Sequence, residues 1–248
     1  MTTSQTLVII PTYNERDNVI QIVPAVLSAL PEADLLIVDD NSPDGTGDLA
    51  QSLFGSDPRF HLLRRTGPRG LGLSYVDSYK YALQSGYSRV VQMDADFSHH
   101  PKYLPDMVKA SENADVVMGS RYCPGGGVEN WPAQRKLLSK FANRYVSVIT
   151  GVQVKDATAG FRCYSRRALE RIHVEEVVSN GYAFQVEMTY RAAIVGMKVV
   201  EVPIIFTDRT LGQSKMTKSV IFESILMPWK LRFALRKLNS LRPAPPTK

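Results

Sequence analysis

Residues 7–15 read LVIIPTYNE, a run of four apolar residues followed at once by a polar turn. The pattern returns as LLIVDD at residues 35–40 and as VVQMDAD at residues 90–96. Short apolar runs bounded by turns are typical of strands that are buried on both faces of a parallel sheet. The carboxyl ends of parallel strands lie along one edge, where open α/β sheets bind ligands, so we expect the three polar turns to meet there.

Helical patterns separate the apolar runs along the first half of the chain. The alternation predicts an α/β fold, with a mostly parallel sheet covered by helices on both faces. The predicted strands lie at residues 7–10, 35–38, 60–63, 90–93 and 116–118, and the predicted helices at residues 17–30, 47–54, 73–84 and 103–112.

The second half is less regular, and no linker composition divides it from the first. We predict helices at 131–150 and near 184–195, and strands at 161–164 and 199–206. We therefore expect one catalytic domain over residues 1–218, an amphipathic segment over 219–241 and a disordered, Pro-rich tail over 242–248.

Composition narrows the class of protein. The 248 residues are 44% hydrophobic and carry a net charge of +6. From Thr207 onward there are nine basic and two acidic residues, which leaves −1 for residues 1–206. A basic tail on a neutral body suits a membrane surface, whereas nucleic-acid binding usually spreads basic charge over the folded domain. We therefore expect no nucleic-acid partner.

Other features exclude several further classes. The two cysteines, Cys123 and Cys163, cannot form a disulfide framework or a zinc cluster, and we expect reduced thiols with Cys163 buried. The polar start predicts no secretory signal peptide, and the chain lacks the long apolar run of a transmembrane helix. Neither Gly-x-Gly-x-x-Gly after the first strand nor a phosphate loop is found, which disfavours nucleotide-cofactor folds.

Asp94 and Asp96 follow the fourth predicted strand. Mg²⁺ and Mn²⁺ usually take one or two carboxylates together with phosphate oxygens and water, so this pair suffices for a metal–diphosphate site. His99 and His100 are neighbours in the same turn, and two adjacent residues rarely reach one ion. We expect them to pack or to cap the helix that begins near Pro101.

Six motifs then carry a resemblance to a known family: VIIPTYNE at 8–15, VDDNSPDGT at 38–46, MDADFSHHP at 93–101, GSRY at 119–122, NGYAFQVE at 180–187 and RTLGQSK at 209–215. The chain resembles the inverting family 2 glycosyltransferases, and among these the dolichol- or polyprenol-phosphate mannose synthases. The resemblance implies the GT-A fold, a Rossmann-like single domain with a mixed, mostly parallel sheet. It also implies GDP-mannose as the donor and a polyprenyl or dolichyl phosphate as the acceptor.

The resemblance assigns roles to individual residues. Asp96 is expected to bind Mg²⁺ or Mn²⁺, with Asp94 as a second ligand and Ser98 acting through a water. Asp94, Asp96, Arg121 and Arg209 form the expected catalytic set. The donor guanosine is expected at Pro11, Tyr13, Glu15, Val38 and Asp40, and the sugar diphosphate at Asp94, Ala95, Asp96, Arg121, Arg209 and Lys215.

The acceptor chemistry follows from the lipid phosphate. A phosphate monoester is already anionic near neutral pH, so it can attack the sugar without a general base. Arginine suits phosphate capture because its planar fork makes paired hydrogen bonds. The expected capture set is Arg121, Arg135, Arg209 and Lys215.

The amphipathic segment at 219–241 has two interpretations. A basic, aromatic-bearing helix can lie in the headgroup region, which predicts a peripheral enzyme on the cytoplasmic side of a membrane. Alternatively, the segment packs on the catalytic domain or against a small membrane partner subunit. The alternative functions are a UDP-glucose-dependent lipid-phosphate glucosyltransferase and, from other classes, a nucleic-acid-binding module or a non-catalytic scaffold.

Overall fold

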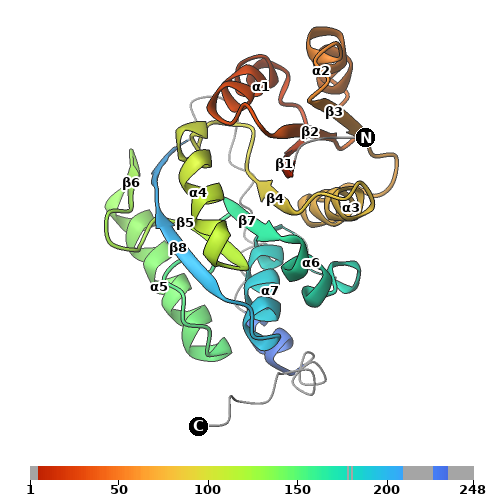
Figure 1. Ribbon diagram of the computed structural model, residues 1–248. Helices are drawn as coiled ribbons and strands as arrows, with labels where there is room; N and C mark the ends of the chain where they lie inside the picture. The colour runs from red at the N-terminus through yellow and green to blue at the C-terminus, as the bar shows by residue number, and fades with distance from the viewer. Residues whose placement is uncertain (1–4, 178, 180, 209–225, 234–248) are drawn as a thin grey trace.

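A computed structural model describes residues 5–177, 179, 181–208 and 226–233 of the chain. Its main sheet has seven strands in the order β3-β2-β1-β4-β7-β5-β8 (Figure 1). β7 runs antiparallel to both neighbours, and the other pairs are parallel. The strands are β1 (Thr6–Thr12), β2 (Asp34–Asp39), β3 (Phe60–Arg64), β4 (Arg89–Gln92), β5 (Val116–Ser120), β7 (Arg162–Ser165) and β8 (Val199–Pro203).

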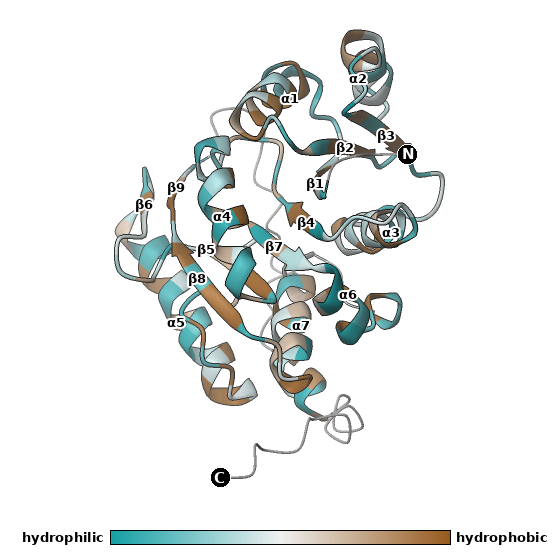
Figure 2. Cartoon of the chain, in the orientation of Figure 1, coloured by the Kyte–Doolittle hydropathy of each residue, from teal (hydrophilic) through white to brown (hydrophobic). Residues whose placement is uncertain are grey.

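Two hydrophobic clusters cover the two faces of this sheet. Leu7 and Ile9 belong to one cluster, together with side chains of α3, α6 and α7. Val8 and Ile10 belong to the other, together with α1, α2 and α4. This alternation explains the unbroken apolar runs of the strands, which Figure 2 shows as brown ribbons. The helices are α1 (Arg16–Ala29), α2 (Thr46–Phe54), α3 (Leu71–Gln84), α4 (Leu104–Ala110), α5 (Ala133–Thr150), α6 (Arg166–Ile172) and α7 (Gly181–Ile194).

The predicted strand at 199–206 is two strands in the structure. β8 ends at Pro203, and β9 (Ile205–Thr207) pairs in parallel with β6 (Gly127–Glu129) in a separate two-stranded sheet. Ile204 joins the two sheets, because its backbone N donates to Ser120 O at 3.1 Å and its carbonyl accepts from Gly127 N at 2.9 Å. The apolar run continues through the junction, so hydrophobicity alone does not reveal the change of partner.

The polar turns meet at one edge of the main sheet, as predicted. Three backbone hydrogen bonds tie the strand ends together: Asp40 N to Thr12 O at 3.0 Å, Arg65 N to Asp39 O at 2.9 Å, and Met93 N to Ile9 O at 3.1 Å. β7 is antiparallel to both β4 and β5, so β5 runs in the same direction as β4, ends at this edge too and brings Arg121 there.

Of the predicted amphipathic segment at 219–241, the structure describes the helix at residues 226–233. Leu231 is buried in the main core, so this part of the segment packs on the catalytic domain. The predicted disordered tail at 242–248 lies outside the described residues. Within the described part of the chain, the helices are too short or too polar to cross a bilayer.

Candidate active site

Asp94 and Asp96 lie just beyond β4 and have different surroundings. Asp96 is buried, and its Oδ1 accepts from the backbone N of Ser98 at 3.1 Å and from the Ser98 hydroxyl at 2.6 Å. The Asp94 side chain is 39% exposed. The first carboxylate is therefore held in one orientation, while the second is accessible to a ligand. Ser98 is placed to orient Asp96, and its predicted action through a water stays a prediction.

Tyr75 lies beneath Asp94. Its hydroxyl faces Asp94 Oδ1 at 3.5 Å, and its ring stacks on Phe184 with centroids 5.5 Å apart. Burial and the adjacent carboxylate raise the pKa of Tyr75 well above 10. The hydroxyl therefore keeps its proton and presents a donor to Asp94 throughout the physiological pH range.

His99 has a packing role, as expected. Its Nδ1 accepts a hydrogen bond from the backbone N of Asp94 at 3.1 Å, so that nitrogen carries no proton. The 3.6 Å approach of the same Nδ1 to Asp94 Oδ2 is consequently not an ion pair. The ring stacks on Phe161 at 5.3 Å, and His100 caps the turn at Pro101–Tyr103 by accepting from Lys102 N at 3.1 Å.

A buried network of amide side chains lies next to the Asp94–Asp96 turn. Gln92, the last residue of β4, donates to Gly160 O at 2.6 Å and to Gln185 Oε1 at 3.1 Å, and it accepts from the Tyr79 hydroxyl. The network joins β4, α3, α7 and the loop before β7. Sequence analysis missed Gln92 and Gln185, because a glutamine within an apolar pattern gives no signal of its partner.

The turns at the ends of β1 and β2 carry the residues that are predicted to bind guanosine. Tyr13 is partly exposed; its hydroxyl accepts from Arg69, whose guanidinium also lies 4.7 Å from the ring centroid. Glu15 Oε2 accepts from Asn18 at 2.7 Å. Pro11 is partly exposed beside them.

Asp40 and Asp39 differ in a way that the sequence did not indicate. The Asp40 carboxylate accepts from Arg65 and, at 2.9 Å, from Gly70 N. Asp39 Oδ1, by contrast, is buried and has no hydrogen-bond partner among the described residues. Asp40 therefore anchors the loop that follows β3, and Asp39 offers an acceptor for an N–H or O–H group.

Val38 and Ala95 are buried. Val38 is fully enclosed in the core beneath the edge, because it lies inside β2 between Pro11 of β1 and Leu63 of β3. Its side chain therefore packs in the core, and the predicted contact of Val38 with the donor stays a prediction.

Arg121 is held by partners that sequence analysis missed. Its Nε donates to Asp156 Oδ2 at 2.7 Å, and its Nη2 donates to Asp156 Oδ1 at 2.6 Å and to Thr158 Oγ1 at 2.8 Å. Asp156 is fully buried, and its backbone N donates to Glu201 Oε1 at 3.0 Å. The guanidinium is thus fixed in orientation at the edge of the sheet.

Trp131 brings Arg121 and Arg135 together. The guanidinium carbons of Arg121 and Arg135 lie 5.6 Å and 4.1 Å from the centroid of the Trp131 ring. Arg135 is exposed and pairs with Asp208 at 2.6 Å. The buried Trp131 Nε1 has no hydrogen-bond partner in the described part of the chain. Arg209 and Lys215, the other two predicted cations, lie outside the described residues.

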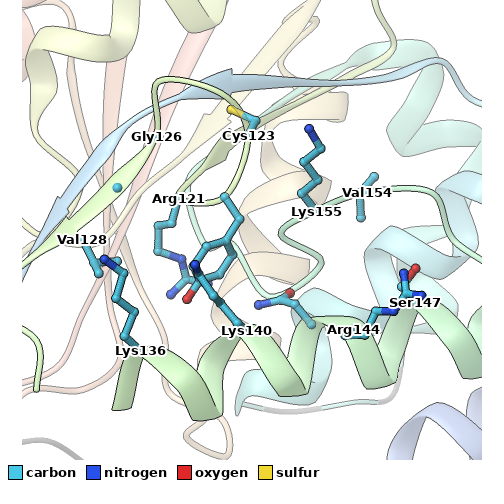
Figure 3. A pocket seen from close by; sticks show the side chains of 13 residues that line it. Arg121, Cys123, Gly126, Val128, Lys136, Lys140, Arg144, Ser147, Val154 and Lys155 are labelled. Atoms are coloured by element: carbon cyan, nitrogen blue, oxygen red, sulfur yellow. The ribbon is translucent and has the colours of Figure 1, made fainter. Parts of the chain in front are cut away.

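A basic cavity of about 460 Å³ opens between α5 and the loop that follows β5 (Figure 3). Its cationic lining residues are Arg121, Lys136, Lys140, Arg144 and Lys155, and among the residues that the structure describes no carboxylate lines it. Tyr122 joins the loop to α5, because its hydroxyl donates to Ser139 at 2.7 Å. The cavity is therefore a positively charged recess connected to the Arg121 site.

Known proteins share this architecture. A crystal structure of glucosyl-3-phosphoglycerate synthase from Mycobacterium tuberculosis, in complex with Mn²⁺, UDP and phosphoglyceric acid, superposes with a TM-score of 0.67 at 14% identity, over 98% of this chain and 81% of that one. This likeness supports the predicted GT-A fold. Other known proteins are much more similar to this chain in sequence.

A polyprenol monophosphomannose synthase from Mycolicibacterium smegmatis is 50% identical, over 96% of this chain and 92% of its own. An undecaprenyl-phosphate mannosyltransferase from Micrococcus luteus is 44% identical, over 89% of this chain and 90% of its own. The family model described as glycosyl transferase family 2 matches residues 7–173. With its sheet, its acidic edge and these relatives taken together, the chain belongs to glycosyl transferase family 2.

Proposed function

We propose that this protein transfers mannose from GDP-mannose to a polyprenyl or dolichyl phosphate, giving a β-mannosyl phosphoryl lipid and GDP. One observation carries the proposal: the Asp94–Asp96 turn follows β4 and Arg121 follows β5 at the same edge of one sheet, and the Trp131 ring lies close to both Arg121 and Arg135 of α5. The first group suits a sugar diphosphate with its metal, and the second suits a phosphate acceptor. The names of the two relatives support mannose and a polyprenyl phosphate.

The residues of this turn fit a divalent cation. Asp94 and Asp96 offer carboxylate oxygens, which Mg²⁺ and Mn²⁺ prefer, and Asp94 is accessible while Ser98 orients Asp96. A bound cation supplies neutralisation of the charge that develops on the departing diphosphate. We place Asp96 as the first ligand and Asp94 as the second.

The donor nucleoside is proposed to bind along Pro11, Tyr13, Glu15, Val38 and Asp40, with Asp39 added to the predicted set. The unpartnered Asp39 Oδ1 supports this addition, because a buried acceptor is costly unless a ligand N–H or O–H satisfies it. Ala95 contributes through its backbone, since its side chain is buried.

The acceptor phosphate is proposed to be held by Arg121 and Arg135, together with Arg209 and Lys215. An oxygen of this phosphate attacks the anomeric carbon from the face opposite the diphosphate. The new bond joins the anomeric carbon to the acceptor oxygen. The bond between this carbon and the oxygen of the β-phosphate breaks, and its electron pair leaves on GDP. The anionic acceptor needs no general base. Arg121 needs no reorientation during the reaction, because Asp156 already holds it in place.

Attachment to the membrane completes the proposal. We infer a peripheral enzyme on the cytoplasmic side of a membrane. The segment at 219–241 contributes to this contact, either with lipid or with a small membrane partner subunit.

The test measures transfer of radiolabelled mannose from GDP-mannose to polyprenyl phosphate in detergent, with Mg²⁺, with Mn²⁺ and with chelator. We expect a labelled mannosyl phosphoryl lipid only when a metal is present, and loss of at least about a hundredfold in rate for Asp96→Asn. UDP-glucose serves as the competing donor. Faster transfer from UDP-glucose than from GDP-mannose would assign the site to a glucosyltransferase instead.

A further inference from the structure

Trp131 lies just before α5 and close to two arginines of the proposed acceptor site. The guanidinium carbon of Arg135 is 4.1 Å from the centroid of its ring, and that of Arg121 is 5.6 Å away. Arginine stacks on aromatic faces because its planar cation is attracted by the negative charge of the π-electrons. Both guanidinium groups therefore gather around one indole ring.

The two arginines depend on this ring to different degrees. Arg121 is fixed by its two-pronged pair with the buried Asp156. The Arg135 side chain is 42% exposed, and within the described part of the chain its ion pair is the one with the partly exposed Asp208. An exposed pair of this kind restrains a long side chain only weakly. The stacking contact with Trp131 is therefore the firmer restraint on Arg135.

The indole ring also offsets repulsion between like charges. Two guanidinium groups that converge on one site repel each other as long as no anion lies between them. The negative face of an aromatic ring reduces this cost, and tryptophan does so best. The ring has a cost of its own, since Trp131 Nε1 is buried without a hydrogen-bond partner among the described residues. A purely apolar side chain would fill the same place without that cost, which indicates a role for the ring face.

Phe206 fixes the position of Trp131. It belongs to β9, which pairs with β6 (Figure 2), and its ring meets Trp131 edge to face with centroids 5.5 Å apart. The same ring meets His99 edge to face, also at 5.5 Å. His99 in turn accepts a hydrogen bond from the backbone N of Asp94 at 3.1 Å. The rings of His99, Phe206 and Trp131 thus connect the Asp94 turn with α5, and we call them the aromatic bridge.

We propose that Trp131 is a positioning residue for the acceptor phosphate. Its ring face orients Arg135 beside Arg121, and the aromatic bridge sets where these two cations lie relative to the donor turn. The inference rests on the proposed function and deepens it, since it adds a residue that acts through Arg135. A phosphate that arrives here meets guanidinium groups that are already oriented, so less side-chain freedom is lost on binding.

The first test compares two substitutions of Trp131 in the transfer assay, with a short, soluble prenyl phosphate as the acceptor. Trp131→Leu removes the π-electrons, and we expect the KM for the acceptor to rise about three- to tenfold while the KM for GDP-mannose stays unchanged. Trp131→Phe keeps an aromatic face without the N–H group and should raise the acceptor KM distinctly less. Equal acceptor KM values for the two variants would overturn the role of the ring face.

A double-mutant cycle separates positioning from a general disturbance of the fold. If Trp131 acts through Arg135, adding Trp131→Leu to Arg135→Ala should change the acceptor KM little. Effects that multiply in the double variant would contradict the proposal, because the two residues would then act independently. The matched control is Phe54→Leu, which removes a partly exposed ring of α2 and should leave the acceptor KM unchanged. Thermal melting checks that each variant is folded.

Fluorescence supplies a readout that does not depend on turnover. The chain has two tryptophans, so Trp229→Phe leaves Trp131 as its single indole. Because the Arg135 cation lies against this ring, binding of the prenyl phosphate should change the emission, and Arg135→Ala should abolish the change. A change that survives Arg135→Ala, or none at acceptor concentrations that saturate transfer, would refute the inference. Absence of mannosyl transfer by the unmodified chain would instead count against the proposed function.

Discussion

Arg121 and Asp156 form a two-pronged ion pair, with Nε to Oδ2 at 2.7 Å and Nη2 to Oδ1 at 2.6 Å. The backbone N of Arg121 donates to the same Oδ2 at 3.0 Å. Asp156 is fully buried, and Glu201 of β8 holds its backbone. The orientation of Arg121, which follows β5, is thus set by a loop and a strand that come much later in the chain.

Removing the charge of Asp156 should lower both stability and activity. In Asp156→Asn the partly buried Arg121 guanidinium loses its counter-charge, so we expect the free energy of unfolding to fall by about 3 kcal/mol. The transfer rate should fall as well, because Arg121 is no longer held in place. Denaturant unfolding and initial rates measure the two effects. The control is Asp57→Asn, whose pair with Arg59 is partly exposed and should cost less than about 1 kcal/mol.

Ser98 should matter for metal binding through Asp96. Ser98→Ala removes the 2.6 Å hydrogen bond to Asp96 Oδ1, so the carboxylate is less well oriented toward a cation. We expect about tenfold weaker binding of Mn²⁺ in the presence of GDP, measured by titration calorimetry. The exposed Ser85 supplies a control in Ser85→Ala. An unchanged Mn²⁺ affinity in Ser98→Ala would show that this hydrogen bond does not position a metal ligand.

Arg135 should affect the acceptor and not the stability. Its ion pair with Asp208 is exposed, so Arg135→Ala should change the free energy of unfolding by less than about 1 kcal/mol. If Arg135 binds the acceptor phosphate, the KM for polyprenyl phosphate should rise about tenfold, since a charge-assisted hydrogen bond is lost. Asp208→Asn, which releases Arg135, should leave this KM unchanged or lower. A rise in KM in both variants would point to a structural effect of the pair.

Arg162 should be a structural requirement of the site. This fully buried side chain donates to Ala159 O at 2.8 Å, Ala157 O at 2.9 Å and the Tyr164 hydroxyl at 3.2 Å. Arg162→Lys cannot reach all three acceptors, and we expect about 2 to 4 kcal/mol of destabilisation. The exposed Arg64, paired with Asp48, is the control as Arg64→Lys. Equal unfolding midpoints for the two variants would contradict this role.

Alkaline pH should reveal the burial of Cys163. Burial raises the pKa of this thiol from 9.0 to about 11. Between these values the unfolded chain releases a proton that the folded chain keeps, so stability falls as the pH rises. By about pH 10 the loss should reach about 1.4 kcal/mol, which corresponds to one pKa unit, and Cys163→Ala should make the pH dependence shallower. Urea unfolding below about pH 10, before the buried tyrosines titrate, measures the free energy of unfolding. The same dependence of this free energy on pH in the unmodified chain and in Cys163→Ala would refute the role of Cys163.

Much of the fold could be predicted because its signals are local. The runs at β1, β2 and β4 are apolar on both faces, and polar turns follow them directly, so the sheet and its ligand-binding edge could be inferred without coordinates. The separate roles of His99 and Cys163 as packing residues were likewise predictable and are confirmed. The division of 199–206 into two strands was missed, because the hydrophobic pattern does not change at Ile204.

The sequence by itself determined the class of fold, the family and the acidic edge, since apolar periodicity and short motifs depend only on neighbouring residues. The tertiary structure alone decided which groups are engaged: Arg121 with Asp156, Asp40 with Arg65, and Val38 enclosed in the core. It also decided that the helix at residues 226–233 packs beside α5, where Trp229 donates to the Tyr145 hydroxyl. These pairings depend on strand order and helix packing, which bring distant residues together by burying surface, and a local pattern carries no record of the partner.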